Sequence, residues 1–113
     1  MRGGHGGGGP GEWATTADTE EKARVLASGV VEARVATCAQ ISAPVTSVYR
    51  WEGGVQTDPE WQVLFKTSAA RYEALEAHIR EHHDYDTPEI IATRITHASA
   101  EYLAWVDAET QPE

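Results

Sequence analysis

The sequence has almost no cysteine: among its 113 residues only Cys38 carries a thiol. A single cysteine cannot form a disulfide within the chain, so the disulfide framework of small secreted domains is excluded. Long hydrophobic runs are also missing, and no apolar stretch approaches the roughly 20 residues that a membrane-spanning helix requires. The glycine-rich first ten residues lack the apolar segment of a signal peptide. We therefore expect a cytoplasmic protein without a membrane partner.

Basic residues are scarce. The chain has 9 Lys and Arg against 18 Asp and Glu, which gives a formal net charge of −9. Such a surface repels a phosphate backbone, and no run rich in Lys or Arg offsets the repulsion, so the sequence predicts no nucleic-acid partner. The same negative charge permits attraction of cations to the surface.

The rest of the composition is that of a folded domain. Hydrophobic residues make up 41% and charged residues 24% of the chain, close to the average for globular proteins. This length suits a single domain with its own core. We expect residues 1–11 to form a flexible glycine-rich leader and residues 12–113 to form one domain.

Hydrophobic periodicity predicts an alternation of strands and helices. Asp18 and Glu21 form a capping-box pattern before the first helix, Gly53-Gly54 is a hairpin turn signal, and Ser68 and Ser99 can cap later helices. The expected strands are 12–17, 38–41, 45–51, 61–66 and 90–95. Merging the hairpin pieces gives the order βαββαβ plus a C-terminal helix, an α+β ferredoxin-like fold. Its helices would cover one face of an antiparallel sheet, and bulky residues on the other face suggest a second subunit.

Several short motifs resemble, in order, those of one known family. Their order and spacing together carry the resemblance, which runs from about Thr15 to Trp105 and identifies the chain as similar to the CutA divalent-cation tolerance family. The motifs are Glu32-Ala33-Arg34 through Ile41, Tyr49-Arg50-Trp51-Glu52-Gly53, Lys66-Thr67, His83-Asp84-Tyr85-Asp86-Thr87-Pro88-Glu89-Ile90, and Tyr102-Leu103-Ala104-Trp105.

The resemblance implies a homotrimer whose sheet edges pair between subunits, a part in divalent-cation tolerance, and no enzymatic reaction. The cofactor it implies is Cu(II) or another divalent cation. The sequence departs from the family pattern in two places: Asp84 replaces a proline, and residues 6–11 are glycine-rich where apolar residues normally lead into the first strand.

His82 and His83 are the candidate metal ligands, because the resemblance attributes copper binding to two consecutive histidines of this loop. His78 lies one helical turn before His82, and histidines at this spacing can share a metal ion. The family's cysteine ligand falls at about Thr15, so a soft thiolate is missing. The alternative is that His82 packs at, or caps, the end of its helix.

A second candidate site is the cleft between subunits that the resemblance implies, with Tyr49, Trp51, Lys66, Tyr85 and Glu89. A carboxylate, an ammonium group and aromatic rings together could hold a small anion or a metal-bound ligand. Alternatively, Glu89 and Lys66 form an ion pair while the aromatic residues anchor the subunit interface.

Three classes of function follow. The first is a non-enzymatic homotrimer that binds divalent metal ions and serves tolerance of them. The second is a signalling or scaffold trimer, similar in architecture to the PII-type regulators, with a small ligand in its inter-subunit clefts. The third is an enzyme that uses Glu89 as a general base.

Cys38 lies among apolar residues, where a buried thiol is usually inert.

Overall fold

The computed structural model describes residues 9–112, so residues 1–8 of the predicted leader lie outside the described part. Within it, strands and helices alternate, and no helix has the length and apolar character required to cross a membrane. The elements are β1 (Gly11–Ala17), α1 (Glu20–Glu32), β2 (Cys38–Ile41), β3 (Val45–Trp51), β4 (Gly54–Thr67), the short 3₁₀ helix η1 (Ala69–Arg71), α2 (Tyr72–His82), β5 (Ile91–Arg94) and α3 (Ala100–Glu109).

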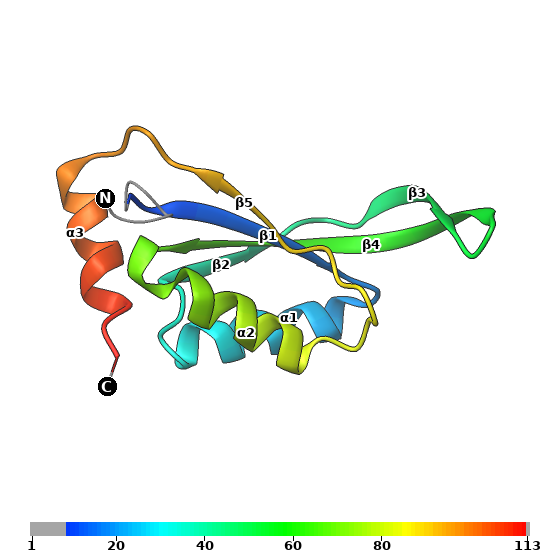
Figure 1. The fold of residues 1–113 in the computed structure, drawn as a ribbon, viewed down its shortest axis with the longest axis horizontal. Coiled ribbons are helices and arrows are strands. Elements are labelled where there is room, and N and C mark those ends of the chain that lie inside the picture. The colour runs from blue at the N-terminus through cyan, green and yellow to red at the C-terminus, as the bar shows by residue number, and fades with distance from the viewer. Residues whose placement is uncertain (1–8, 113) are drawn as a thin grey trace.

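One long strand organises the antiparallel sheet. The strand order is β2-β4-β1-β5, and β3 also pairs with β4. The C-terminal half of β4 pairs with β1 and β2, whereas residues 54–60 pair with β3. Figure 1 shows the β3–β4 hairpin projecting beyond the helices. The structure therefore confirms the predicted ferredoxin-like α+β fold, with β2 and β3 following one another along β4.

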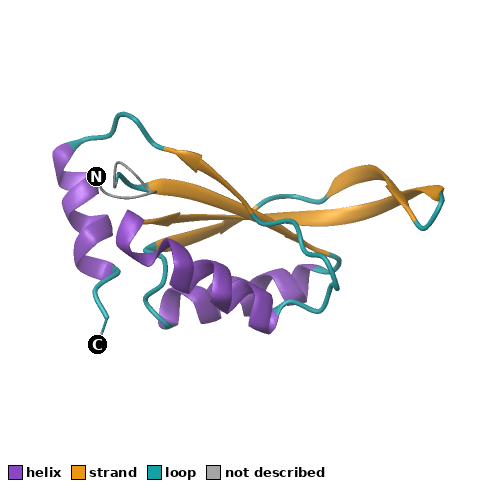
Figure 2. Cartoon of the chain, viewed as in Figure 1, coloured by secondary structure: helices purple, strands orange, loops and turns teal. Residues whose placement is uncertain are grey.

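Helices α1 and α2 pack against one face of this sheet, as Figure 2 shows. Residues of β4 alternate, so that Val63 and Phe65 are fully buried while their neighbours on the strand are partly exposed. Val30 of α1 and Leu75 and Ile79 of α2 are equally buried and belong to the same core. The core thus lies between the two helices and one sheet face, as the periodicity predicted.

The helix caps agree only in part with the sequence. Ser99 caps α3, because its side chain accepts a hydrogen bond of 3.1 Å from the Tyr102 N–H. The predicted Asp18 cap of α1 is wrong by one residue: Thr19 is the extended cap, and its hydroxyl accepts from the Lys22 N–H at 3.1 Å. The carboxylate of Asp18 instead lies 3.1 Å from the Lys22 ammonium group.

The hairpin turn also lies one residue earlier than predicted. Trp51 pairs with Gly54, so the two central residues are Glu52 and Gly53. Their φ angles are 51° and 83°, and positive φ at both positions is characteristic of the tight turns whose twist matches that of the strands.

Helix α3 is fixed to the end of the sheet through backbone carbonyls. The Thr37 hydroxyl donates to the carbonyl of Val106 at 3.1 Å, and the Arg34 guanidinium donates to the carbonyl of Ala108 at 3.0 Å. The predicted side-chain cap by Ser68 is wrong, because its hydroxyl forms no hydrogen bond with the helix that follows. The Ser68 hydroxyl instead lies 3.0 Å from the Thr110 hydroxyl. Val106 itself is 1% exposed, so α3 completes the core at this end.

The first strand begins at Gly11, one residue before the predicted start of the domain. The chain is held there by two hydrogen bonds: the Tyr72 hydroxyl donates to the Gly9 carbonyl at 2.6 Å, and the Ile95 N–H donates to the Pro10 carbonyl at 3.1 Å. A Cβ on Gly11 would lie 2.7 Å from the Tyr72 hydroxyl oxygen. Glycine therefore fits this position because the tyrosine approaches the backbone closely.

We predict that Gly11→Ala lowers the free energy of unfolding by about 1 kcal/mol, the usual net contribution of a hydrogen bond such as that between Tyr72 and Gly9. The control is Gly54→Ala, since the nearest atom to a Cβ there is 3.8 Å away. Urea unfolding of both variants checks this. Equal stability of the two variants would contradict the close contact with Tyr72.

Candidate functional site

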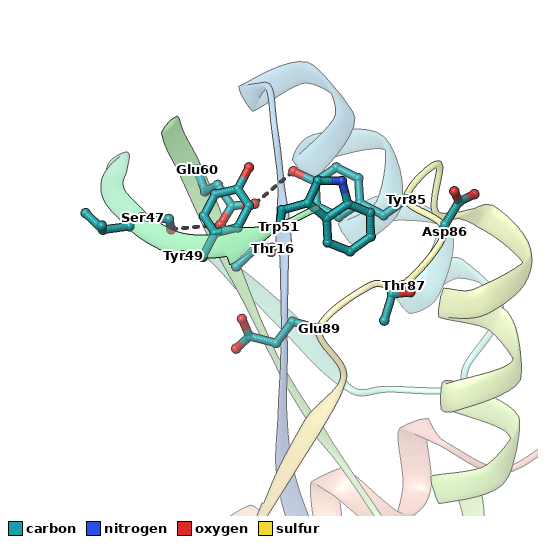
Figure 3. A pocket seen from close by; sticks show the side chains of 10 residues that line it. Thr16, Ser47, Tyr49, Trp51, Glu60, Tyr85, Asp86, Thr87 and Glu89 are labelled. Atoms are coloured by element: carbon teal, nitrogen blue, oxygen red, sulfur yellow. Dashed lines mark hydrogen bonds between the residues drawn. The ribbon is translucent and has the colours of Figure 1, made fainter. Parts of the chain in front are cut away.

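A pocket of about 570 Å³ lies where the β3–β4 hairpin leaves the body of the domain. We call it the hairpin pocket. It is formed by the end of β1, by β3 and Glu60 of the hairpin, and by the loop that follows α2 (Figure 3). Its lining residues are Thr16, Ser47, Val48, Tyr49, Trp51, Glu60, Tyr85, Asp86, Thr87 and Glu89.

Glu60 is held in place at the centre of this pocket by two hydroxyl groups. Ser47 donates to one carboxylate oxygen and Tyr85 to the other, each at 2.8 Å. Burial raises the pKa of Tyr85 well above its usual value, and the hydrogen bond to Glu60 raises it further. The phenol therefore stays protonated at neutral pH and remains a donor. The hairpin and the loop after α2 are joined through these bonds.

Tyr49 and Trp51 contribute aromatic rings to the wall of the pocket. The Tyr49 hydroxyl donates to the Asp58 carboxylate at 2.6 Å, and this hydrogen bond raises the pKa of Tyr49. Tyr49 and Trp51 are 42% and 46% exposed. Figure 3 shows both side chains extending from β3 toward the loop that carries Tyr85. Apolar surface is therefore available on the pocket wall.

His83 fastens the loop to β1. Its side chain is 2% exposed, and its Nε2 lies 2.6 Å from the Thr16 carbonyl oxygen, to which it must donate. Its Nδ1 accepts from the Tyr85 N–H at 3.1 Å. Both nitrogens of a neutral ring are thus occupied, and neither faces an open coordination position. The geometry gives His83 a structural role in positioning Tyr85.

The loop has a second attachment at Asp84, the residue that replaces a proline of the family pattern. Its carboxylate accepts from the Lys22 ammonium group of α1 at 2.6 Å. This bond lowers the pKa of Asp84 and raises that of Lys22. Because both side chains are about half exposed, the pair contributes modestly to stability. The substitution thus exchanges a rigid residue for an ion pair to α1.

His82 and His83 form hydrogen bonds with different elements, His82 with α2 and His83 with β1. The Nδ1 of His82 lies 2.9 Å from the carbonyl oxygen of His78, and its ring stacks on the His78 ring with centroids 4.1 Å apart. Thr15, at about the position that the resemblance gives to the family's cysteine, is fully buried on the core side of β1. Among residues 9–112, no three His, Cys, Asp or Glu side chains form a group that could hold a metal ion.

The residues of one subunit therefore do not fit a copper centre. Of the four ring nitrogens of His82 and His83, only Nε2 of His82 forms no hydrogen bond within the described part of the chain. The bond of His82 to the last turn of α2 matches the alternative in which this residue packs at the helix end. Assignment of His82 and His83 as metal ligands stays a prediction.

The predicted cleft residues come together, with one exception. Tyr49, Trp51, Tyr85 and Glu89 all line the hairpin pocket. Lys66 does not line the pocket of one subunit. The predicted cleft lies between subunits, so the ion pair between Lys66 and Glu89 stays a prediction.

The register of β4 explains the position of Lys66. It places Lys66 beside Glu12 and Cys38, and its ammonium group lies 3.1 Å from the Glu12 carboxylate. Six residues along a strand separate it from Glu60, a distance of about 20 Å. Cys38 is partly exposed rather than buried, with its sulfur 3.9 Å from the Tyr102 hydroxyl.

Sequence reasoning missed six of the ten pocket residues, which are Thr16, Ser47, Val48, Glu60, Asp86 and Thr87. Glu60 lies in the polar part of β4, where no hydrophobic alternation indicates a strand, and no motif includes it. Only the pairing of β3 with β4 reveals Glu60 as a pocket residue, because Ser47 reaches Glu60 once the two strands are in register.

We predict that His83→Ala lowers the free energy of unfolding by about 2–4 kcal/mol, because a buried ring and two hydrogen bonds are lost. His82→Ala is the matched control on an exposed side chain, with an expected loss below about 1 kcal/mol. Thermal and urea unfolding measure both. If His83→Ala were as stable as His82→Ala, the assigned role of His83 as the loop's anchor would be wrong.

Comparison with known proteins gives the same family as the motifs. The model of the CutA1 divalent ion tolerance protein family matches residues 13–109. "Protein CutA, chloroplastic" of Arabidopsis thaliana is 38% identical over 96 residues, which cover 85% of this chain and 53% of that protein. The "Divalent-cation tolerance protein CutA" of an Escherichia coli strain is 37% identical over 93 residues, which cover 82% of this chain and 83% of that one.

The fold agrees as well. The structure of CutA from Synechococcus elongatus superposes with a TM-score of 0.88 at 32% identity, covering 92% of each chain. With the family model spanning most of the chain and the relatives covering it at this identity, the chain belongs to the CutA1 divalent ion tolerance protein family.

Proposed function

We propose that this chain serves tolerance of divalent cations as a non-enzymatic homotrimer, and that the hairpin pocket, rather than a resident copper centre, is its functional site. Membership of the family supports the role in metal-ion tolerance. The choice of site is supported by one observation above all: the Glu60 carboxylate is fixed by hydroxyls from two separate segments, Ser47 and Tyr85. Preorganisation of this kind lowers the cost of binding a ligand.

The distribution of apolar surface supports the trimer. Val48 and Val55 on one face of the hairpin are 65% and 64% exposed, and Trp51 on the other face is 46% exposed. The hairpin extends away from its own core (Figure 1), so these side chains find no cover within the described residues of the subunit. Large exposed apolar patches commonly mark interfaces between proteins. A second and third copy would cover this hairpin and enclose the pocket.

Catalysis has no part in this proposal. The serine of the pocket donates to Glu60, not to a histidine that could activate it. Glu89, the candidate general base, is exposed, whereas burial is the usual means by which a carboxylate becomes a base near neutral pH. We propose that the pocket binds a ligand and does not transform it. The family resemblance implies copper as the divalent cation. We propose that copper is the toxic ion that the cell must tolerate and not a cofactor bound by the protein.

We predict a native mass of about three times the 12.3 kDa of one chain, measured by native mass spectrometry and sedimentation. The double variant Val48→Glu/Val55→Glu should shift the assembly toward monomer, because it places charges on the exposed hairpin face. Val25→Glu is the control, since Val25 is 67% exposed on α1, away from the hairpin. A monomeric starting protein would contradict the trimer.

The function itself is tested in cells that lack their own CutA-type protein and carry this chain. We expect Asp86→Asn/Glu89→Gln, which removes two charges from the pocket, to lower the copper concentration that the cells withstand. His82→Ala should leave it unchanged, as should the charge control Glu101→Gln on α3. Loss of tolerance in His82→Ala with full tolerance in the pocket variant would contradict the proposal and return the function to the histidines.

A further inference from the structure

The charge of the hairpin pocket has one sign. Glu60, Asp86 and Glu89 line it, and none of its ten lining residues is a lysine, arginine or histidine. With Lys66 paired to Glu12 elsewhere on the sheet, one subunit supplies no ammonium group to its own pocket for an anionic ligand. Neither Asp86 nor Glu89 forms a hydrogen bond or ion pair within the described residues of one subunit, so the subunit does not balance their charges. The pocket thus favours a cation.

The walls of the pocket distinguish between kinds of cation. Three aromatic rings contribute to them: Tyr49 and Trp51 from the hairpin, and Tyr85 from the loop after α2. The hydroxyls of both tyrosines donate to carboxylates, which leaves the rings as apolar surface with a negative face. Such rings attract ammonium groups, most strongly when the cation is an organic one that sheds water readily.

A bare metal ion fits this arrangement poorly. Divalent metal ions in proteins are held by several oxygen, nitrogen or sulfur atoms at about 2.0–2.6 Å. The carboxylates of the hairpin pocket do not converge in this way, and no set of three potential ligands exists among residues 9–112. Both oxygens of Glu60 also already accept hydrogen bonds. Aromatic rings would contribute nothing to the coordination of a small hydrated ion.

We propose that the hairpin pocket binds a small organic cation that carries an ammonium group. The rings of Tyr49, Trp51 and Tyr85 contact the methylene or methyl groups around the nitrogen, and Glu60, Asp86 and Glu89 balance its charge. This inference rests on the proposed function, in which the pocket is the functional site, and it names the chemical class of the ligand. It differs from the small anion or metal-bound ligand that the sequence suggested, because one subunit does not bring Lys66 to its own pocket.

The first test uses choline, with 3,3-dimethyl-1-butanol as its neutral counterpart of nearly the same shape, and butyrate as an anion. Calorimetric titration of the full chain in its native assembly measures all three. We expect choline to bind at least about tenfold more tightly than the neutral compound, since cation–π attraction and the carboxylate charges act only on choline. Binding of choline should also weaken as salt rises, because exposed charges are screened.

Variants place the binding in the pocket. Asp86→Asn/Glu89→Gln should weaken choline binding about threefold to tenfold, and Trp51→Leu, which keeps apolar bulk without the ring, about twofold to fivefold. Glu101→Gln is the matched control, because it removes one exposed charge on α3 and should leave choline affinity unchanged. Circular dichroism and native mass confirm that each variant keeps its fold and assembly.

Each contrary outcome overturns the inference. Equal binding of choline and its neutral counterpart would show a merely apolar pocket, and tighter binding of butyrate would show an anion site. Displacement of choline by one equivalent of Zn(II) would show a metal site, and no binding of choline at millimolar concentration would exclude the class. The copper tolerance of the Asp86→Asn/Glu89→Gln cells is measured separately. If tolerance falls while choline does not bind, the pocket keeps its function and only the ligand class is wrong.

Discussion

The pairing of β4 with three other strands is the constraint on which this structure depends. Its C-terminal half lies inside the domain, where Val63 and Phe65 are fully buried beneath α1 and α2. Its N-terminal half leaves the domain and pairs only with β3. Glu60 lies where the two halves meet. Burial of one half of the strand thus fixes the position of a carboxylate in the other half, and the hairpin pocket forms at this junction.

The loop after α2 completes the pocket because three consecutive residues attach it to β1, α1 and β4. His83 binds the Thr16 carbonyl of β1, Asp84 binds Lys22 of α1, and Tyr85 reaches Glu60 of β4. The buried bond of His83 is worth more than the exposed ion pair of Asp84, since solvent screens the latter. A loop without regular structure therefore holds a defined position. Within one subunit, His83 of the motif thus positions the loop.

Much of the fold could be predicted from the sequence, because periodic burial of residues such as Leu75 and Ile79 shows directly in the order of apolar residues. The full length of β4 could not. Residues 56–60 are polar and include Pro59, and they form a strand only because β3 pairs with them. Asp18 and Thr19 are both able to cap a helix, so sequence alone could not decide between them.

The residues of the hairpin pocket could be predicted from the sequence only where they belong to a motif of the family. Tyr49, Trp51, Tyr85 and Glu89 belong to motifs of the family and meet in one pocket, whereas Glu60 belongs to none. Lys66 also belongs to a motif, but within one subunit its pairing with Glu12 places it away from the pocket. The acidic lining of the pocket in one subunit, formed by Glu60, Asp86 and Glu89, became visible only in the structure.

The central claim is that the pocket, and not a histidine metal centre, is the functional site. Calorimetric titration of Cu(II) into the chain beginning at Gly9, beside His82→Ala, tests it most directly. This start removes His5, which could bind copper adventitiously, and keeps the Gly9 carbonyl that Tyr72 binds. The account predicts weak binding, or none, with no stoichiometric site. Tight binding of one copper ion per subunit that is lost in His82→Ala would contradict it.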